Sequence, residues 1–165
     1  ASFVGAAAGG SAFLYLDLSW VLGYPEVYIP ALPGFAIVLE IRPVFARKPR
    51  WGYRLAVSGL LGVSLLSFFV WQHHLFVSGI NGDLRPFYML STELISIPTG
   101  FTFLCGMMTL WRGNIRYTVP MLFALAGFFN FLIGGLSGVF LSDVPSDVTT
   151  TGSFFSLAHF HSTIM

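Results

Sequence analysis

The sequence predicts an all-α membrane protein, built as a polytopic bundle of transmembrane helices. Of its 165 residues, 55% are hydrophobic and only 9% are charged. A soluble domain of this length would carry about a quarter charged residues, so too few polar groups are available to cover a surface facing water. Lipid is therefore the expected surroundings of most of this chain, and helices satisfy their own backbone hydrogen bonds there.

Several apolar runs are long enough to cross a bilayer, which takes roughly 20 mostly apolar residues. They cover about 14–41, 53–80, 86–111, 117–141 and 153–165, the last being short. No internal repeat or low-complexity linker separates them, so we expect residues 1–165 to belong to a single domain. Because the chain opens without an initiator Met and stops inside an apolar stretch, we expect it to be an internal piece of a longer polypeptide.

Positive charge gathers in alternate connections between these runs. Seven of the eight Lys and Arg residues follow the first run or the third: Arg42, Arg47, Lys48, Arg50, Arg54, Arg112 and Arg116. Two crossings separate these connections, so they fall on one side, which the positive-inside rule assigns to the cytoplasm. Charge and hydropathy thus predict the same topology. A net charge of +1 also argues against a nucleic-acid partner, which requires a concentrated basic face.

All four histidines lie within predicted spans, as the pairs His73–His74 and His159–His161. One buried histidine is usually a hydrogen-bonded core residue, but ionisable groups at membrane depth are costly and mark functional sites. At about 1.5 Å of rise per residue, both pairs and Tyr24 fall at a similar depth in the outer half of the membrane. Neutral imidazole suits iron, copper and zinc, so the sequence predicts a metal-binding layer.

The spacing of His159 and His161 predicts two cofactors rather than one. Side chains two residues apart on a helix point about 200° apart, so a single metal cannot easily bind both. Axial imidazole is a common haem ligand, and two haems on opposite sides of one helix fit this spacing. Zinc is disfavoured, because it prefers ligands three or four residues apart.

Glu26 and Glu93 are the acids that we expect to be buried within spans. Either could carry protons, bind a metal, or be a protonated carboxyl satisfied by a neighbour. Function is favoured more strongly for Glu26, because it lies beside Tyr24 on a run that several prolines distort.

Six segments resemble subunit I of the haem–copper oxidases. They are GYPEVYIPALPGF at 23–35, VWQHHLFVSGI at 70–80, SIPTG at 96–100, WRGNI at 111–115, IGGLSG at 133–138 and LAHFH at 157–161. They follow the family's order at nearly its spacing, so the resemblance covers essentially the whole chain. It corresponds to about the sixth through tenth of twelve transmembrane helices. It implies a respiratory enzyme that reduces O2 to water, taking up protons and passing electrons from a low-spin haem to a high-spin haem and metal centre.

The resemblance also implies residue roles. His159 matches the proximal ligand of the high-spin haem and His161 an axial ligand of the low-spin haem, while His73 and His74 match two copper ligands. Three further positions match catalytic or proton-pathway residues: Glu26, a proton relay; Thr99, near the top of a proton pathway; and Tyr28, a tyrosine that these oxidases cross-link to a copper-binding histidine.

The chain departs from the family pattern around the second metal. Tyr24 stands where the third copper-binding histidine is expected, so Tyr28 lacks its cross-linking partner. Other departures are Glu93 at a usually apolar position, Thr102 in place of a pathway lysine, and Thr151 and Gly152 in place of a His-Asp pair that binds magnesium or manganese.

These departures keep alternatives open. Oxygen ligands harden a metal site and favour iron over copper. The alternative is therefore a nitric oxide reductase-like enzyme that forms N2O at non-haem iron, with Tyr24 or Glu93 near that metal. A proton-coupled transporter, a third hypothesis, would explain Glu26 but not the two histidine pairs.

The resemblance further implies partners and a location. The expected partners are other subunits of a respiratory complex, cytochrome c or quinol as the electron donor, and membrane lipid. The expected location is a bacterial or archaeal plasma membrane or the mitochondrial inner membrane, which the chain crosses several times.

Overall fold

The computed structural model describes residues 5–165, and that part of the chain is helical without strands. The main helices are α1 (Ala12–Glu26), α2 (Tyr28–Ala46), α3 (Tyr53–Leu66), α4 (Arg85–Leu94), α5 (Ser96–Leu110), α6 (Val119–Ser142), α7 (Val144–Thr150) and α8 (Phe154–Ile164). Short 3-10 helices occur at η1 (Ala6–Ala8), η2 (Ser67–Phe69), η3 (Trp71–Leu75) and η4 (Gly82–Leu84).

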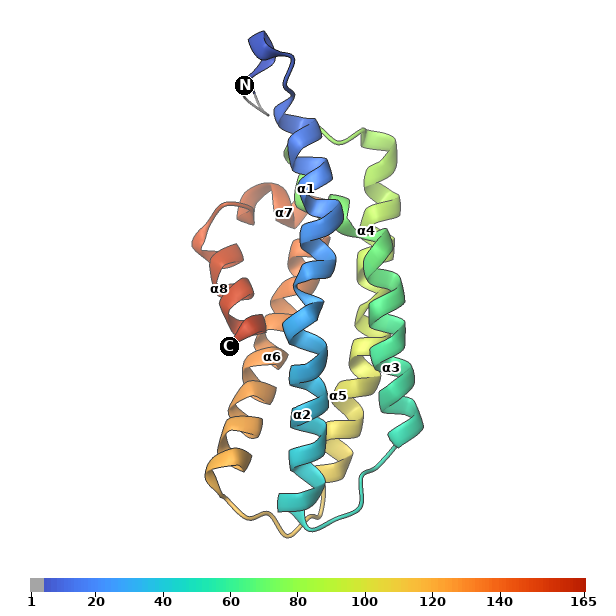
Figure 1. Ribbon diagram of the computed structural model, residues 1–165, viewed down its shortest axis with the longest axis vertical. Coiled ribbons are helices and arrows are strands. Elements are labelled where there is room, and N and C mark those ends of the chain that lie inside the picture. The colour runs from blue at the N-terminus through green and yellow to red at the C-terminus, as the bar shows by residue number, and fades with distance from the viewer. Residues whose placement is uncertain (1–4) are drawn as a thin grey trace.

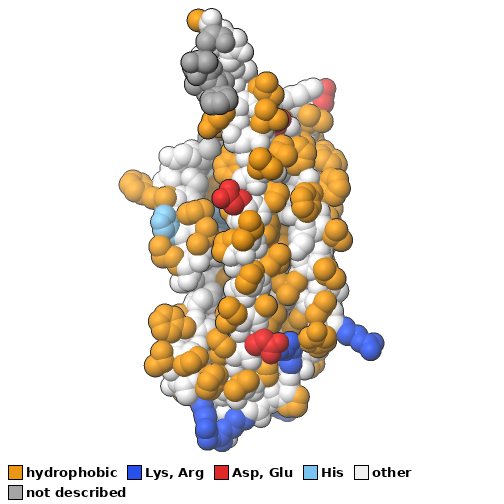
Figure 2. Space-filling model, viewed as in Figure 1, with side chains coloured by type: hydrophobic (Ala, Val, Ile, Leu, Met, Phe, Trp, Pro, Cys, Tyr) orange, Lys and Arg blue, Asp and Glu red, His pale blue; other side chains and the backbone are white. Residues whose placement is uncertain are grey.

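Long rods run side by side along the molecule (Figure 1). Three helical stretches of the described chain are long and apolar enough to cross a membrane: Ala12–Ala46, Gly82–Leu110 and Val119–Ser142. Tyr53–Phe69 is a shorter apolar helix. Orange apolar side chains cover much of the visible surface (Figure 2), as expected of helices that face lipid or further helices. The predicted all-α membrane bundle is therefore confirmed.

The second apolar run, 53–80, is not one continuous helix. α3 ends at Leu66, and the chain continues through η2 and η3. The segment then folds inward, where Leu75 and Phe76 are fully buried in a cluster with Tyr88. Hydropathy finds the apolar side chains but cannot tell whether they face lipid or the interior of the bundle. Consequently His73 and His74 lie in η3, outside the regular helix.

The basic connections meet at one end of the bundle (Figure 2). Lys48 Nζ donates to the main-chain oxygens of Met108 and Trp111, at 2.8 and 2.6 Å, so the α2–α3 loop holds the end of α5. The predicted grouping of these loops on one side is confirmed. Arg42 differs from its predicted place in a loop: it lies within α2, 2% exposed, with Cζ 3.8 Å from the centre of the Phe128 ring.

Glycines allow α8 to pack closely on α6. A Cβ atom at Gly134 would lie 2.9 Å from the main-chain nitrogen of Thr163, and one at Gly138 would lie 2.9 Å from Cε1 of His159. Any larger residue would push α8 outward. Small residues at helix contacts serve this purpose in membranes, and here they fix the distance between α6 and the histidines of α8.

Candidate metal centre

Tyr24, His73 and His74 form one aromatic cluster, contributed by α1 and η3. The two imidazole centroids are 4.2 Å apart. The Tyr24 ring lies 4.9 Å from His73, almost perpendicular to it, and 5.6 Å from His74. The structure thus brings together three of the residues that the sequence predicted in one layer.

A hydrogen bond from α4 orients the imidazole of His73. Its Nδ1 lies 3.1 Å from Thr92 Oγ1, and the Thr92 hydroxyl donates its own proton to the Tyr88 carbonyl at 2.5 Å. Because that proton is used, the Nδ1–H of His73 must be the donor to Thr92. Nε2 of His73 therefore keeps a free lone pair, the state in which imidazole binds a metal.

Two α1 side chains that the sequence pattern did not single out hold η3 in place. Asp17 Oδ1 accepts from Trp71 Nε1 at 3.2 Å and from Gln72 Nε2 at 2.8 Å, while Trp20 stacks on His74 at 3.6 Å with planes 6° apart. A usable signal existed, since residues 17, 20, 24 and 28 have the spacing of one helix face.

His159 points from α8 toward α6. Its Nδ1 lies 2.8 Å from the Gly134 carbonyl oxygen and 3.2 Å from Ser137 Oγ. A carbonyl can only accept, so Nδ1 carries the proton and Nε2 is free to bind a metal. Nothing in the sequence pattern had singled out Ser137.

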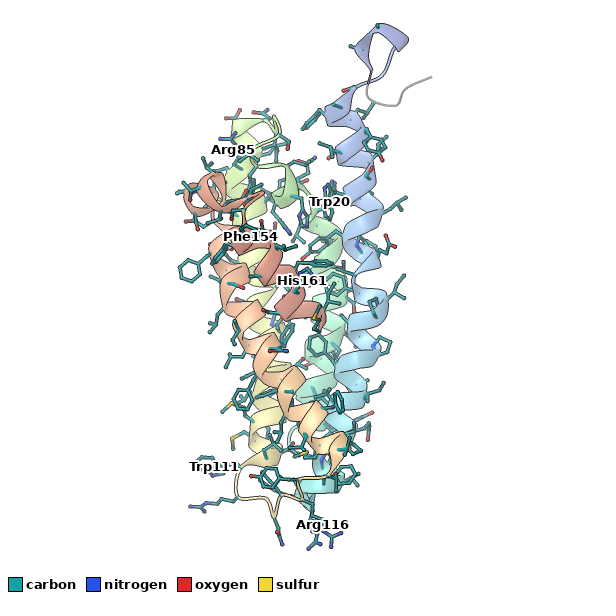
Figure 3. The ribbon with its side chains drawn as sticks, turned by 90° about the vertical axis from the view of Figure 1, so that its left-hand side faces the viewer. Trp20, Arg85, Trp111, Arg116, Phe154 and His161 are labelled. Carbon is teal, nitrogen blue, oxygen red and sulfur yellow. The ribbon has the colours of Figure 1, made fainter. Side chains whose placement is uncertain are left out.

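His161, on the other side of α8, likewise has its Nδ1 bonded to a carbonyl and its Nε2 free to bind a metal. Its Nδ1 lies 2.8 Å from the Leu157 carbonyl oxygen, and the side chain is exposed. Figure 3 shows His161 and Trp20 in the half of the bundle that also holds Arg85, away from Trp111 and Arg116. Both α8 histidines therefore fit ligation of haem iron, on opposite faces of the helix.

The predicted burial of Glu26 and Glu93 is wrong for the described chain, where both side chains are exposed. Tyr24 and Tyr28 share one face of the α1–α2 rod, so Glu26, midway between them, points the other way. Thr92 faces His73, which turns the neighbouring Glu93 about 100° away. Neither acid reaches the cluster.

The hydroxyl groups of the remaining predicted residues each bond to a residue four positions earlier in the chain. The Tyr28 hydroxyl donates to the Tyr24 oxygen at 2.9 Å. Thr99 Oγ1 donates to the Ile95 carbonyl at 2.8 Å, and Thr102 Oγ1 to the Pro98 carbonyl at 3.3 Å.

A copper centre with three imidazoles does not fit these residues. Within residues 5–165, no three His, Cys, Asp or Glu side chains gather closely enough to hold a metal ion. The adjacent His73 and His74 supply two ligands, and the aromatic ring of Tyr24 occupies the third side.

Comparison with known proteins identifies the family. Residues 1–165 match the sequence model described as "Cytochrome C and Quinol oxidase polypeptide I". The chain is 47% identical, over 93% of its length, to the "Probable cytochrome c oxidase subunit 1-beta" of Nocardia farcinica, and 45% identical over 94% to the "Cytochrome c oxidase subunit 1" of Corynebacterium diphtheriae. It is 43% identical over 93% to the "Quinol oxidase subunit 1" of Bacillus subtilis. It covers 26%, 27% and 24% of those proteins, respectively. The chain therefore belongs to the family of subunit I of the cytochrome c and quinol oxidases, as the resemblance predicted.

Proposed function

We propose that this chain is part of the catalytic subunit of a respiratory terminal oxidoreductase of the haem–copper type. In this proposal His161 would hold a low-spin haem and His159 a high-spin haem, and the bound haems would supply the electron transfer for the reduction of O2 to water. The observation that carries the proposal is the geometry of α8. Its two histidines face opposite ways, and each has Nδ1 on a backbone carbonyl and Nε2 free.

The chain's own residues would contribute orientation and basicity. The hydrogen bond from His159 Nδ1 to Gly134 fixes the ring plane and makes Nε2 a stronger electron donor. Gly138 leaves room for that ring beside α6. A bound haem supplies the redox chemistry, and α8 would set how far apart the two haems lie.

Proton uptake is assigned to Glu26 and Thr99. Glu26 is the last residue of α1, and Val27 separates it from α2, so its carboxyl lies where the two helices join, on the side away from Tyr24 and Tyr28. The Thr99 hydroxyl, half-buried on α5, can pass a proton along while it donates to Ile95.

The cellular setting follows from the proposed reaction. The enzyme would work within a multi-subunit complex in a respiratory membrane, such as the bacterial plasma membrane. Relatives named as cytochrome c oxidases and as quinol oxidases are similarly close in identity, so either electron donor is compatible with the chain.

Reduction of NO to N2O is the second candidate, and Tyr24 favours it. Joining two NO molecules takes two electrons, whereas reducing O2 to water takes four. The cross-linked tyrosine of the oxidases helps to supply the four electrons that O2 requires. Tyr28 here has a tyrosine, not a histidine, four residues before it, so that cross-link cannot form. The histidine geometry and the family both favour either redox reaction over a proton-coupled transporter.

Turnover of the purified complete complex with each gas tests the proposal. We expect a haem Soret band, and we expect the complex to consume O2 when O2 is the only gas supplied. Formation of N2O without appreciable O2 consumption would replace the first candidate with the second. A complex without any Soret band would overturn both.

A further inference from the structure

A groove of about 360 Å³ runs between α5 and α6 at the basic end of the bundle. Apolar side chains of the two helices form its walls: Phe103, Met107 and Leu110 on α5, with Leu125, Phe129 and Leu132 on α6. Each wall extends about 10 Å along its helix, at about 1.5 Å per residue. Met107 and Phe129 are 48% and 60% exposed, so the groove is open to its surroundings. It can therefore take an extended apolar chain from the membrane.

The mouth of the groove lies where α5 ends. Trp111 and Arg112 follow directly after the last residue of α5 and complete the lining. Figure 3 shows Trp111 in the half of the bundle away from His161. Trp111 is 62% exposed, and Tyr117, just before α6, is 70% exposed. Exposed Trp and Tyr side chains mark the level of the lipid headgroups, so Arg112 lies at that level and the apolar walls extend from it into the membrane.

Positive charge exceeds negative charge at this end of the molecule. Of the seven acidic residues of the chain, only Glu40 lies near the basic loops, and it already pairs with Arg50. Within residues 5–165, no acidic side chain forms an ion pair with Arg112. The guanidinium of Arg112 is therefore available to an anionic ligand at the mouth of the groove.

Arg42 adds a buried positive charge beneath the groove. Its Cζ lies 3.8 Å from the centre of the Phe128 ring, which lines the groove, and the residue is 2% exposed. Its Nε and Nη2 atoms have no hydrogen-bond partner among the described residues. Because a charge in the low-dielectric interior is screened little, Arg42 raises the positive potential along the groove.

An apolar groove with an unpaired cation at its mouth suits a ligand that has an apolar chain and an anionic head. We propose that this groove binds an anionic phospholipid from the leaflet on the basic side, which the positive-inside rule assigns to the cytoplasm. One acyl chain lies between α5 and α6, and the phosphate pairs with Arg112. The lipid site lies apart from the histidine pairs, and its occupation does not depend on the proposed haem chemistry.

Other occupants use only part of this groove. A free anion could pair with Arg112 but would gain nothing from the apolar walls. A phospholipid with a choline headgroup carries a cation of its own, which the surplus of basic residues repels. A helix of another subunit is about 10–12 Å across with its side chains, so it would pack over the groove rather than fill it.

Native mass spectrometry of the complete purified enzyme tests the headgroup preference. The enzyme would be stripped of lipid in detergent and offered phosphatidylglycerol or phosphatidylcholine. We expect phosphatidylglycerol to bind at least about fivefold more tightly at low salt, the usual contribution of one basic residue beside an anionic headgroup. Arg112→Gln should remove most of this preference and leave the binding of phosphatidylcholine unchanged. The matched control is Arg54→Gln, which removes an exposed charge from α3 at the same end and should change the preference less than about twofold.

A second pair of variants tests the groove itself. Leu132→Trp places a bulky ring in the groove and should abolish tight binding of phosphatidylglycerol. Ile133→Trp alters the next residue of α6, which is 60% exposed and outside the lining, and should not. Glycerol phosphate, which has the charge but no acyl chain, should fail to displace the lipid.

Three results would overturn the lipid site: equal binding of the two lipids, an unchanged preference in Arg112→Gln, or the same binding in both Trp variants. Displacement of the lipid by glycerol phosphate would instead make it a site for free anions and would equally refute the proposal. None of these results involves haem, so the lipid site and the proposed function can fail separately.

Discussion

The two histidine pairs are held in place by different kinds of partner. On α8, His159 and His161 each bond to a backbone carbonyl, and the Ser137 hydroxyl adds a side-chain contact to His159. In η3, the partners are side chains, Thr92 for His73 and Trp20 for His74. A carbonyl acceptor is present whatever side chain its residue carries, whereas a side-chain partner is lost when that residue is replaced. The α8 pair matches the family pattern, and the departure at Tyr24 lies beside the other pair.

The largest effect is expected from removing His159, the proposed ligand of the high-spin haem. His159→Ala should reduce turnover of the complete enzyme to below about one per cent, because the side chain that would hold the reacting haem is removed. The low-spin haem on the opposite face of α8 should keep its spectrum. If the fully expressed variant turned over as fast as the unmodified enzyme, His159 would not be a ligand at the reaction centre.

A large structural effect is expected at Gly134. Gly134→Ala would place Cβ 2.9 Å from the main-chain nitrogen of Thr163, and such overpacking costs about 1–3 kcal/mol. Thermal release of haem should therefore begin at a lower temperature. Gly135→Ala is the matched control, since nothing lies within 4 Å of its added Cβ. If both variants release haem alike, close packing of α8 on α6 is not what holds His159.

A smaller effect, confined to the η3 pair, is expected from Thr92→Val. The substitution keeps the shape but removes the acceptor for His73 Nδ1. Loss of such a partner weakens metal binding by about 10–100-fold. Metal retention during chelator dialysis would measure this, with Thr149→Val as an exposed control. Loss of haem from the Thr92 variant would show that the two pairs are not independently held.

The smallest effect concerns Asp147, which lies in α7 beyond the membrane spans. Burial raises the pKa of this carboxyl above its usual 3.8, and the hydrogen bond from Thr151 partly opposes the shift. A raised pKa means that the folded state binds the proton more tightly. Stability should therefore fall as the pH rises from about 3.8 through the raised pKa. Asp147→Asn should flatten this part of the curve of unfolding temperature against pH, and an unchanged slope would contradict the assignment.

The sequence predicted the fold well, because the apolar runs and the alternating charge report directly on membrane crossing. It also predicted that His159 and His161 face apart, since helix geometry fixes the angle between them. The inward fold at Leu75 and Phe76 was not predictable, because hydropathy is the same for a lipid-facing and a buried residue. The exposure of Glu26 could have been foreseen from its position opposite Tyr24 and Tyr28.

Haem analysis of the complete enzyme and of its His161→Ala variant tests the central claim most directly, namely that one helix holds two different haems. We predict two haems in the unmodified enzyme, one low-spin and one high-spin by electron paramagnetic resonance. The variant should lose the low-spin signal alone. Loss of both signals together, or survival of both, would contradict the assignment of His159 and His161 to separate haems.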